Sequence, residues 1–411
     1  MLKFKILFIV ASIITLSRYV NAICKYAGQM CPEEAPCCNG GWCSNNPRFC
    51  STGCEPENSF SVNSCYPKPG CKSFYDDFSK SSIVSYSKYN GDPNTAKWTS
   101  DFLPDYASVD DSGLVNLKMY QDKTHKNSFG NYQGFGATIS TTRWMQFGRV
   151  TARIKTACIS KGVVSSMVVS NNVSIVGITM DTLGDEIDFE WVGLNKTEVQ
   201  SNYYWNGTLD YTKGAHHYVC PDTTADFHTY FVDWQPDALS WGVDGKVLRT
   251  VTKKSTFSST DNVYKYPSQP SRVAFSIWDG GMGAPGTGNW SGFPTDWSDP
   301  NKVYTMYVDW VNVTYETNDD GSWPPAGYGL TDKAKSSSTT EKTSYTTMGV
   351  NQPVESTAGD GNNSTTSADT HTESGSVVKK YGIPALAVVG GIAGTAFIFG
   401  TFKHFTKGKE Y

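Results

Sequence analysis

A heptapeptide near the middle of the 411-residue chain alternates acidic and bulky apolar side chains: Asp185-Glu186-Ile187-Asp188-Phe189-Glu190-Trp191. A period of two predicts a β-strand with Glu186, Asp188 and Glu190 on one face and the apolar side chains on the other. Like charges on one face repel, so a purely structural strand gains nothing from them. The alternative interpretation is a solvated acidic face on an edge strand.

The spacing of the two glutamates suits paired-carboxylate chemistry. Their Cα atoms lie roughly 13 Å apart on an extended strand. Both side chains can lean toward each other, to the ~5–5.5 Å between carboxyl groups that retaining glycosidases use. The shorter Asp188 between them leaves room for a sugar ring.

The surrounding sequence predicts an all-β fold. Residues 71–316 contain many short segments rich in Val, Ile, Thr, Tyr and Phe, and Asp244-Gly245 between apolar segments indicates a hairpin turn. We therefore expect a β-sandwich over these residues. Aromatic residues make up 13% of the chain, which suits stacking on sugars as well as core packing. A net charge of −4 argues against nucleic-acid binding, and no motif calls for a metal or a cofactor.

The N-terminus is typical of a secreted protein. Residues 1–22 predict a signal peptide, with Lys3 and Lys5 before an apolar run and a cleavage site at Val20-Asn21-Ala22. Seven Asn-X-Ser/Thr sequons support secretion without proving it. They are at Asn172, Asn195, Asn206, Asn289, Asn312, Asn362 and Asn363.

The C-terminal part predicts a stalk and a membrane attachment. Residues 331–378 are rich in Ser, Thr, Gly and Asp, which indicates a disordered, O-glycosylated stalk. Residues 382–402 form an apolar run of membrane-spanning length, and the basic tail 403–411 favours a transmembrane helix. A cleaved lipid-anchor signal, attached at Asn362, Ser374 or Gly375, is the alternative.

The N-terminal part of the mature chain is a small cysteine-rich unit, residues 23–66, too small to fold without covalent staples. Nine of the eleven cysteines lie between Cys24 and Cys71, and in a secreted chain they indicate disulfides rather than zinc. The Cys37-Cys38 doublet, together with the sequence Cys-Asn-Gly-Gly-Trp-Cys at residues 38–43, resembles the hevein-like chitin-binding module of family 18. A disulfide cap without a ligand is the alternative.

The resemblance implies a binding site for N-acetylglucosamine made by Asn39, Trp42 and Phe49. It also implies the disulfides Cys24–Cys38, Cys31–Cys43 and Cys37–Cys50. Cys54, Cys65 and Cys71 then compete for one bond. We expect Cys158 and Cys220 to pair in the larger domain, and the odd number of cysteines leaves at least one thiol unpaired or bonded to another chain.

Residues 74–316 resemble glycoside hydrolase family 16, a jelly-roll β-sandwich with a substrate cleft. The motifs that carry the resemblance occur in the family's order: 186–190, 200–204, 227–230, 233–236, the hairpin around Trp241, and 276–281. The resemblance implies that Glu186 is the nucleophile, Glu190 the acid/base and Asp188 the helper between them. A neighbouring carboxylate would raise the pKa of Glu190 and keep it protonated.

The resemblance also implies substrate contacts. Trp278 is the expected stacking platform, and Thr287 ends the Ala-Pro-Gly-Thr segment that contacts sugar in the family. Asn202, Tyr203 and His228 are further cleft candidates, and core packing is the alternative for each aromatic residue. We expect Tyr204 and Trp234 to lie in the core, and the long segment 171–183 to reshape the cleft edge.

A chitin-binding module, this domain and a Ser/Thr stalk together resemble the fungal Crh-type chitin–glucan transglycosylases of the cell wall. The resemblance implies a cell-wall enzyme that cleaves chitin chains and transfers them to β-glucan or chitin. The signal peptide and the apolar run 382–402 predict that it lies outside the cell and is attached to the membrane. A β-glucan hydrolase that uses the same carboxylates is one alternative. A non-enzymatic chitin-binding adhesin is another.

Overall fold

The computed structural model describes residues 24, 30–39, 41–51, 53–81, 83–171, 184–299 and 301–315. The predicted signal peptide, stalk, apolar run 382–402 and basic tail lie outside these residues. So do residues 172–183, on which the expected change of the cleft edge depends. Within the described part of the chain, every helix is too short or too polar to cross a membrane.

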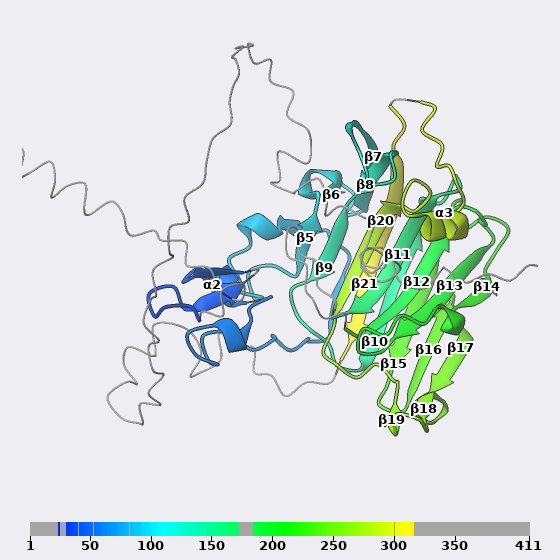
Figure 1. Ribbon diagram of the computed structural model, residues 1–411. Helices are drawn as coiled ribbons and strands as arrows, with labels where there is room; N and C mark the ends of the chain where they lie inside the picture. Colours follow the sequence, from blue (N-terminus) through cyan, green and yellow to red (C-terminus); the bar gives the residue numbers. More distant parts are fainter. Residues whose placement is uncertain are drawn as a thin grey trace, which may run out of the picture.

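Two large β-sheets pack face to face, as the strand pattern predicts (Figure 1). The first sheet has nine strands: β17 (Lys246–Thr252), β16 (Ala238–Val243), β15 (His228–Trp234), β10 (Gly148–Lys155), β21 (Tyr304–Thr314), β7 (Val115–Lys126) and β6 (Ala107–Val109) in spatial order, with β3 (Phe74–Asp76) paired to β21 and β8 (Tyr132–Gly136) paired to β7. We call it the outer sheet.

The second sheet has eight strands and carries the acidic heptapeptide, so we call it the carboxylate sheet. Its spatial order is β14 (Ala215–Tyr218), β13 (Glu198–Tyr204), β12 (Glu186–Val192), β11 (Val163–Ser170), β20 (Arg272–Asp279), β9 (Thr138–Thr141), β5 (Trp98–Phe102) and β4 (Ile83–Ser85). All its neighbours are antiparallel except β4 and β5. The remaining described elements are short: β18 (Phe257–Ser258), β19 (Val263–Tyr264), α3 (Pro285–Ser291) and the 3-10 turns η2 (Tyr86–Lys88), η3 (Pro104–Tyr106), η4 (Tyr211–Lys213) and η5 (Lys253–Thr256).

The core fills the space between the two sheets with aromatic and branched side chains. Trp191 of β12 packs edge-on against Tyr230 of β15, with ring centroids 4.6 Å apart, and both are fully buried. Trp241 of β16 donates a hydrogen bond from Nε1 to the Asp188 carbonyl, at 3.0 Å. The apolar face of β12 is therefore buried in the core, which turns its acidic face away from the outer sheet.

The hairpin between β16 and β17 has the turn that its sequence predicts. Asp244 and Gly245 both have positive φ, 49° and 78°, and Val243 pairs with Lys246 across the two-residue loop. Positive φ at both positions is the requirement of a type I′ turn.

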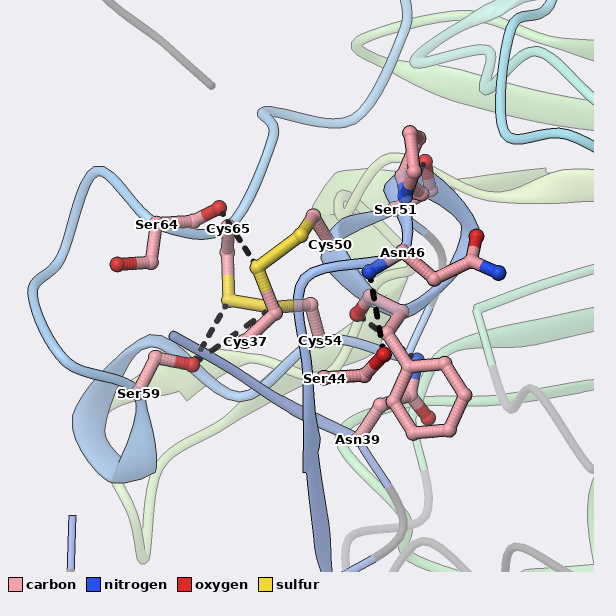
Figure 2. Close-up of a disulfide and its surroundings, with 12 residues drawn as sticks. Cys37, Asn39, Ser44, Asn46, Cys50, Ser51, Cys54, Ser59, Ser64 and Cys65 are labelled. Carbon is pink, nitrogen blue, oxygen red and sulfur yellow. Dashed lines mark hydrogen bonds between the residues drawn. A yellow bond between two sulfur atoms is a disulfide. The ribbon is translucent and has the colours of Figure 1, made fainter. Parts of the chain in front are cut away.

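The cysteine-rich module contains the paired strands β1 (Cys37–Asn39) and β2 (Trp42–Ser44), the single-turn helix α2 (Pro47–Cys50) and the 3-10 turn η1 (Pro56–Asn58). Its disulfides are Cys24–Cys38, Cys31–Cys43, Cys37–Cys50 and Cys54–Cys65, and Figure 2 shows the last two. The first three are the pairs that the hevein-like resemblance implies, and the fourth leaves Cys71 as a buried thiol.

The expected Cys158–Cys220 disulfide is wrong for this structure, in which both are thiols. Cys158 is fully buried, and its thiol donates a hydrogen bond to the Trp191 carbonyl at 2.9 Å. Burial raises the pKa of the Cys158 thiol to about 12. Cys220 follows β14 and is only partly buried.

Candidate active site

The acidic strand β12 is a central strand. It pairs with β11 on one side and β13 on the other, so the interpretation as a solvated edge strand is wrong. Glu186 and Asp188 are 4% and 2% exposed, whereas Glu190 is half-buried. Three carboxyl groups thus share one face of a strand, with little contact to water.

The strand register shows which side chains surround these carboxyl groups, because directly paired residues project to the same face of a sheet. On β11 the partners of Glu186, Asp188 and Glu190 are Ser170, Val168 and Ser166; on β13 they are Tyr204, Asn202 and Gln200. Small and polar side chains dominate this set. We call the surface that contains these residues the carboxylate face.

Burial raises the pKa of all three carboxyl groups, and neighbouring carboxylates raise those of Glu186 and Glu190 further. Burial raises the pKa of Asp188 to about 7, although the backbone N–H of Asn202 and the Arg249 guanidinium act in the opposite direction. Burial and the neighbouring Asp188 raise the pKa of Glu186 to about 8, against the Ser170 hydroxyl. Burial, Asp188 and Glu186 raise the pKa of Glu190 well above its usual range.

Glu190 has the environment of a proton donor. Its neighbours favour the protonated form, and its buried Oε1 has no hydrogen-bond partner among the described residues. A buried carboxyl oxygen without a partner is costly, so such an atom needs a reason. A glycosidic oxygen placed above the strand would supply that partner.

Trp278 of β20 lies on the carboxylate face, because Ser276, two residues before it, pairs with Ser166 opposite Glu190. Its ring is only 5% exposed, since Trp290 of α3 stacks on it with centroids 5.8 Å apart and planes 23° apart. Trp290 also donates from Nε1 to Gln200 Oε1, at 2.8 Å. The half-buried Trp290, which sequence reasoning missed, therefore covers the Glu190 end of the carboxylate face.

The loop that carries Trp290 is fixed by one buried carboxylate. Asp279 at the end of β20 accepts hydrogen bonds from Thr295 Oγ1, Trp297 Nε1, and the backbone N–H groups of Gly134 and Met282. Thr287, expected to contact sugar, is 7% exposed within α3, and its carbonyl accepts from Ser291 Oγ. The structure thus places Thr287 beneath the surface of this loop.

Two of the expected cleft residues are elsewhere. Tyr203 pairs with Ile187 and packs on Trp241 in the core, so its place on the cleft face was wrong. Its neighbour Tyr204, expected in the core, pairs with Glu186 on the carboxylate face. His228 was also wrong as a cleft residue: it belongs to β15 of the outer sheet, and its Nδ1 lies 2.7 Å from Asp244 Oδ2.

Asn202 and Trp234 lie where we expected them. Asn202 lies on the carboxylate face opposite Asp188, with its Oδ1 accepting from the Tyr203 N–H at 2.9 Å. Trp234 lies fully buried in the core.

In the cysteine-rich module the three expected ligand residues differ in access. Trp42 is 49% exposed on β2 and can offer a ring face to a sugar. Phe49 of α2 is half-buried. Asn39 is 5% exposed, and its Nδ2 donates to the Phe49 carbonyl at 3.2 Å, so it braces the module from within (Figure 2).

The family profile "Glycosyl hydrolases family 16" matches residues 95–312. Crh-like protein 2 of Aspergillus fumigatus is 37% identical over 308 residues, covering 72% of this chain and 62% of that protein. Congo red hypersensitive protein 2 of Saccharomyces cerevisiae is 36% identical over 303 residues, covering 70% of this chain and 58% of that protein.

The chain therefore spans about three fifths of the length of these relatives, 62% and 58%. Among solved structures, the Crh5 transglycosylase in complex with NAG is similar, with a TM-score of 0.46 and 26% identity. That similarity covers 63% of this chain and 95% of the Crh5 chain.

Proposed function

The chain belongs to the glycosyl hydrolases of family 16, and on that premise we propose that it is a retaining transglycosylase that remodels the polysaccharides of a cell wall. The observation that carries the proposal is the set of three carboxyl groups on one face of β12: Glu186 and Asp188 are buried, and the half-buried Glu190 has an unpartnered oxygen. Relatives with Crh-like names at 37% identity support the same activity.

In the first step, Glu190 donates its proton to the glycosidic oxygen while Glu186 attacks the anomeric carbon. The C–O bond breaks, the leaving sugar departs with the proton, and a glycosyl-enzyme ester forms on Glu186. In the second step, the Glu190 carboxylate takes a proton from an acceptor hydroxyl. The acceptor oxygen then attacks the anomeric carbon and releases Glu186 as a carboxylate, with net retention.

Asp188 allows Glu186 to be ionised during the reaction, because the two carboxyl groups share a proton. Burial raises the pKa of both carboxyl groups, and the Asp188 carboxylate raises that of Glu186 further. Two buried carboxyl groups on one face of a strand can share one proton, so either of them can hold it while the other is ionised. Glu186 can be ionised when the sugar develops positive charge above it, and Asp188 then carries the proton.

We propose chitin as the glycosyl donor and β-glucan or chitin as the acceptor. The exposed Trp42 in a module that resembles chitin-binding domains supports chitin. Transfer requires a sugar hydroxyl to outcompete water, and the Trp290–Trp278 stack beside Glu190 supports such an acceptor site by covering one end of the carboxylate face.

We also propose that the enzyme works outside the cell and is attached to the membrane through residues 382–402. The signal-like residues 1–22 support export, and the basic residues after the apolar run favour a span over a cleaved anchor signal. A tag placed after Tyr411 distinguishes the two: it stays on the surface form if the run spans the membrane, and is lost if the run is cleaved.

The central experiment incubates the expressed protein with chitin oligomers and fluorescent laminarin oligomers, and then separates the products by size. We expect fluorescent products larger than the laminarin acceptor, and none with Glu190→Gln. Shortened chitin oligomers with the fluorescence still at acceptor size would identify a hydrolase instead. No change in either substrate, from a folded protein, would overturn the proposal.

A further inference from the structure

The edge strand β14 adds two exposed side chains to the carboxylate face. His216 pairs with Gln200, which pairs with Glu190, and Tyr218 pairs with Glu198. His216, Tyr218, Gln200 and Glu198 therefore project to the same side of the sheet as Glu190. The intervening His217 confirms the alternation, because its Nε2 lies 2.8 Å from Ser201 Oγ on the opposite side.

These side chains form a row that begins at the acid/base. Gln200 receives the hydrogen bond from Trp290, and the next strand contributes His216, whose Nδ1 lies 2.7 Å from Glu198 Oε1. Tyr218 stands beside this pair and is 67% exposed. The row crosses the strands, and β14 lies two strand spacings, roughly 10 Å, from β12.

The chemistry of the row fits a carbohydrate. A tyrosine ring offers a flat apolar face to one side of a pyranose, and its hydroxyl remains in water. The His216–Glu198 pair offers a donor and acceptors to sugar hydroxyls at the same place. A singly exposed tyrosine is ordinary, but Tyr218 shares its sheet face with the carboxyl groups and lies two residues along β14 from His216, at the end of the row that starts at Glu190.

We propose that β14 forms an outer sugar-binding subsite, in which one ring of a bound oligosaccharide stacks on Tyr218 and hydrogen-bonds the His216–Glu198 pair. The occupant is the part of the polysaccharide chain that extends past Glu190 toward this edge of the sheet. The inference rests on the proposed function, since it extends the same cleft. The cysteine-rich module lies at the opposite side of the domain, beyond β5, and leaves the β14 edge uncovered (Figure 1).

An outer subsite is filled only by longer oligosaccharides, which gives the experiment its design. We compare kcat/KM of the full-length protein across a length series of chitin donors and a length series of laminarin acceptors. For Tyr218→Ala we expect the advantage of long over short oligomers to fall about 3- to 10-fold in one series. Turnover of the shortest productive substrate should remain at the wild-type level. Tyr218→Phe keeps the ring and should keep the length dependence.

The matched control is Tyr75→Ala, which removes a 58% exposed tyrosine from β3 of the outer sheet. An unchanged length dependence in Tyr218→Ala, or an equal loss in Tyr75→Ala, would overturn the subsite. Calorimetric binding of the same oligomers to Glu186→Gln tests it without turnover: equal affinity for long and short oligomers, with and without Tyr218→Ala, also rejects it. A wild-type protein that forms no products but binds oligomers in this length-dependent way would reject the proposed function and retain the subsite.

Discussion

Replacing Glu186 with glutamine should stabilise the fold at neutral pH, although it removes the proposed nucleophile. Glu186 is 4% exposed, and burial with the neighbouring Asp188 raises its pKa from 4.5 to about 8. Between these two pH values the unfolded chain has lost this proton while the folded protein still holds it. Stability therefore falls as pH rises through this window, and is highest with respect to this group below pH 4.5.

The size of the effect follows from the same interval. From pH 4.5 to pH 7, the proton held only by the folded state corresponds to about 3 kcal/mol of lost stability. Glutamine has no proton to lose, but its amide must find hydrogen-bond partners in place of those of the acid. We therefore expect Glu186→Gln to be more stable than wild type by roughly 1–3 kcal/mol at pH 7, and nearly equal to it at pH 4.5.

Urea unfolding at the two pH values, with the disulfides intact, measures the difference. The matched control is Asp101→Asn, a buried acid that pairs with Arg272 at 3.0 Å. Breaking that pair leaves an uncompensated buried cation, so this variant should lose roughly 3–5 kcal/mol. A Glu186→Gln protein that is less stable than wild type at pH 7, or whose advantage is the same at both pH values, would refute the reasoning.

Three further predictions concern activity. Glu190→Gln should lower transfer from chitin oligomers about 10²- to 10⁴-fold. With a donor whose leaving group needs no proton, the variant should recover much of the rate of the first step. Equal losses on both donors would contradict an acid role. Asp188→Asn should lose less activity than Glu190→Gln and shift the acidic limb of the pH–rate profile to lower pH, because it removes a charge that raises the pKa of Glu186. Trp42→Ala should weaken retention on solid chitin while turnover of soluble oligomers stays unchanged, and normal retention would mean that the module is only a structural cap.

Local periodicity was sufficient to find the carboxylate face. Alternation of acidic and apolar residues is a property of the strand itself, so it predicted which side chains of β12 face the core before any partner strand was known. The same rule shows why Tyr203 was misplaced. Asn202 and Tyr203 are neighbours and cannot share a face of one strand, so accepting Asn202 as a cleft residue should have selected Tyr204.

The remaining errors depended on contacts between distant parts of the chain. The position of His228 depends on β15 joining the outer sheet, and no local pattern states which sheet a strand joins. Trp290 reaches Gln200 only because the Asp279 carboxylate fixes the loop before and after α3. The separation of Cys158 from Cys220 likewise depends on how two loops pack, which sequence spacing does not contain.

The placement of the acids in a central strand is itself an argument for chemistry. An edge strand could have left three like charges in water at little cost, whereas β12 is paired on both sides and its carboxyl groups are held where their ionisation is unfavourable. The strand is held in place despite this cost. Hydrogen bonds to β11 and β13, contacts with the aromatic core and the Trp241 hydrogen bond to the Asp188 carbonyl all support it. A fold selected for stability alone would have neutral side chains here, so a destabilising set of acids on an interior strand is expected where each carboxyl has a separate task in proton and sugar transfer.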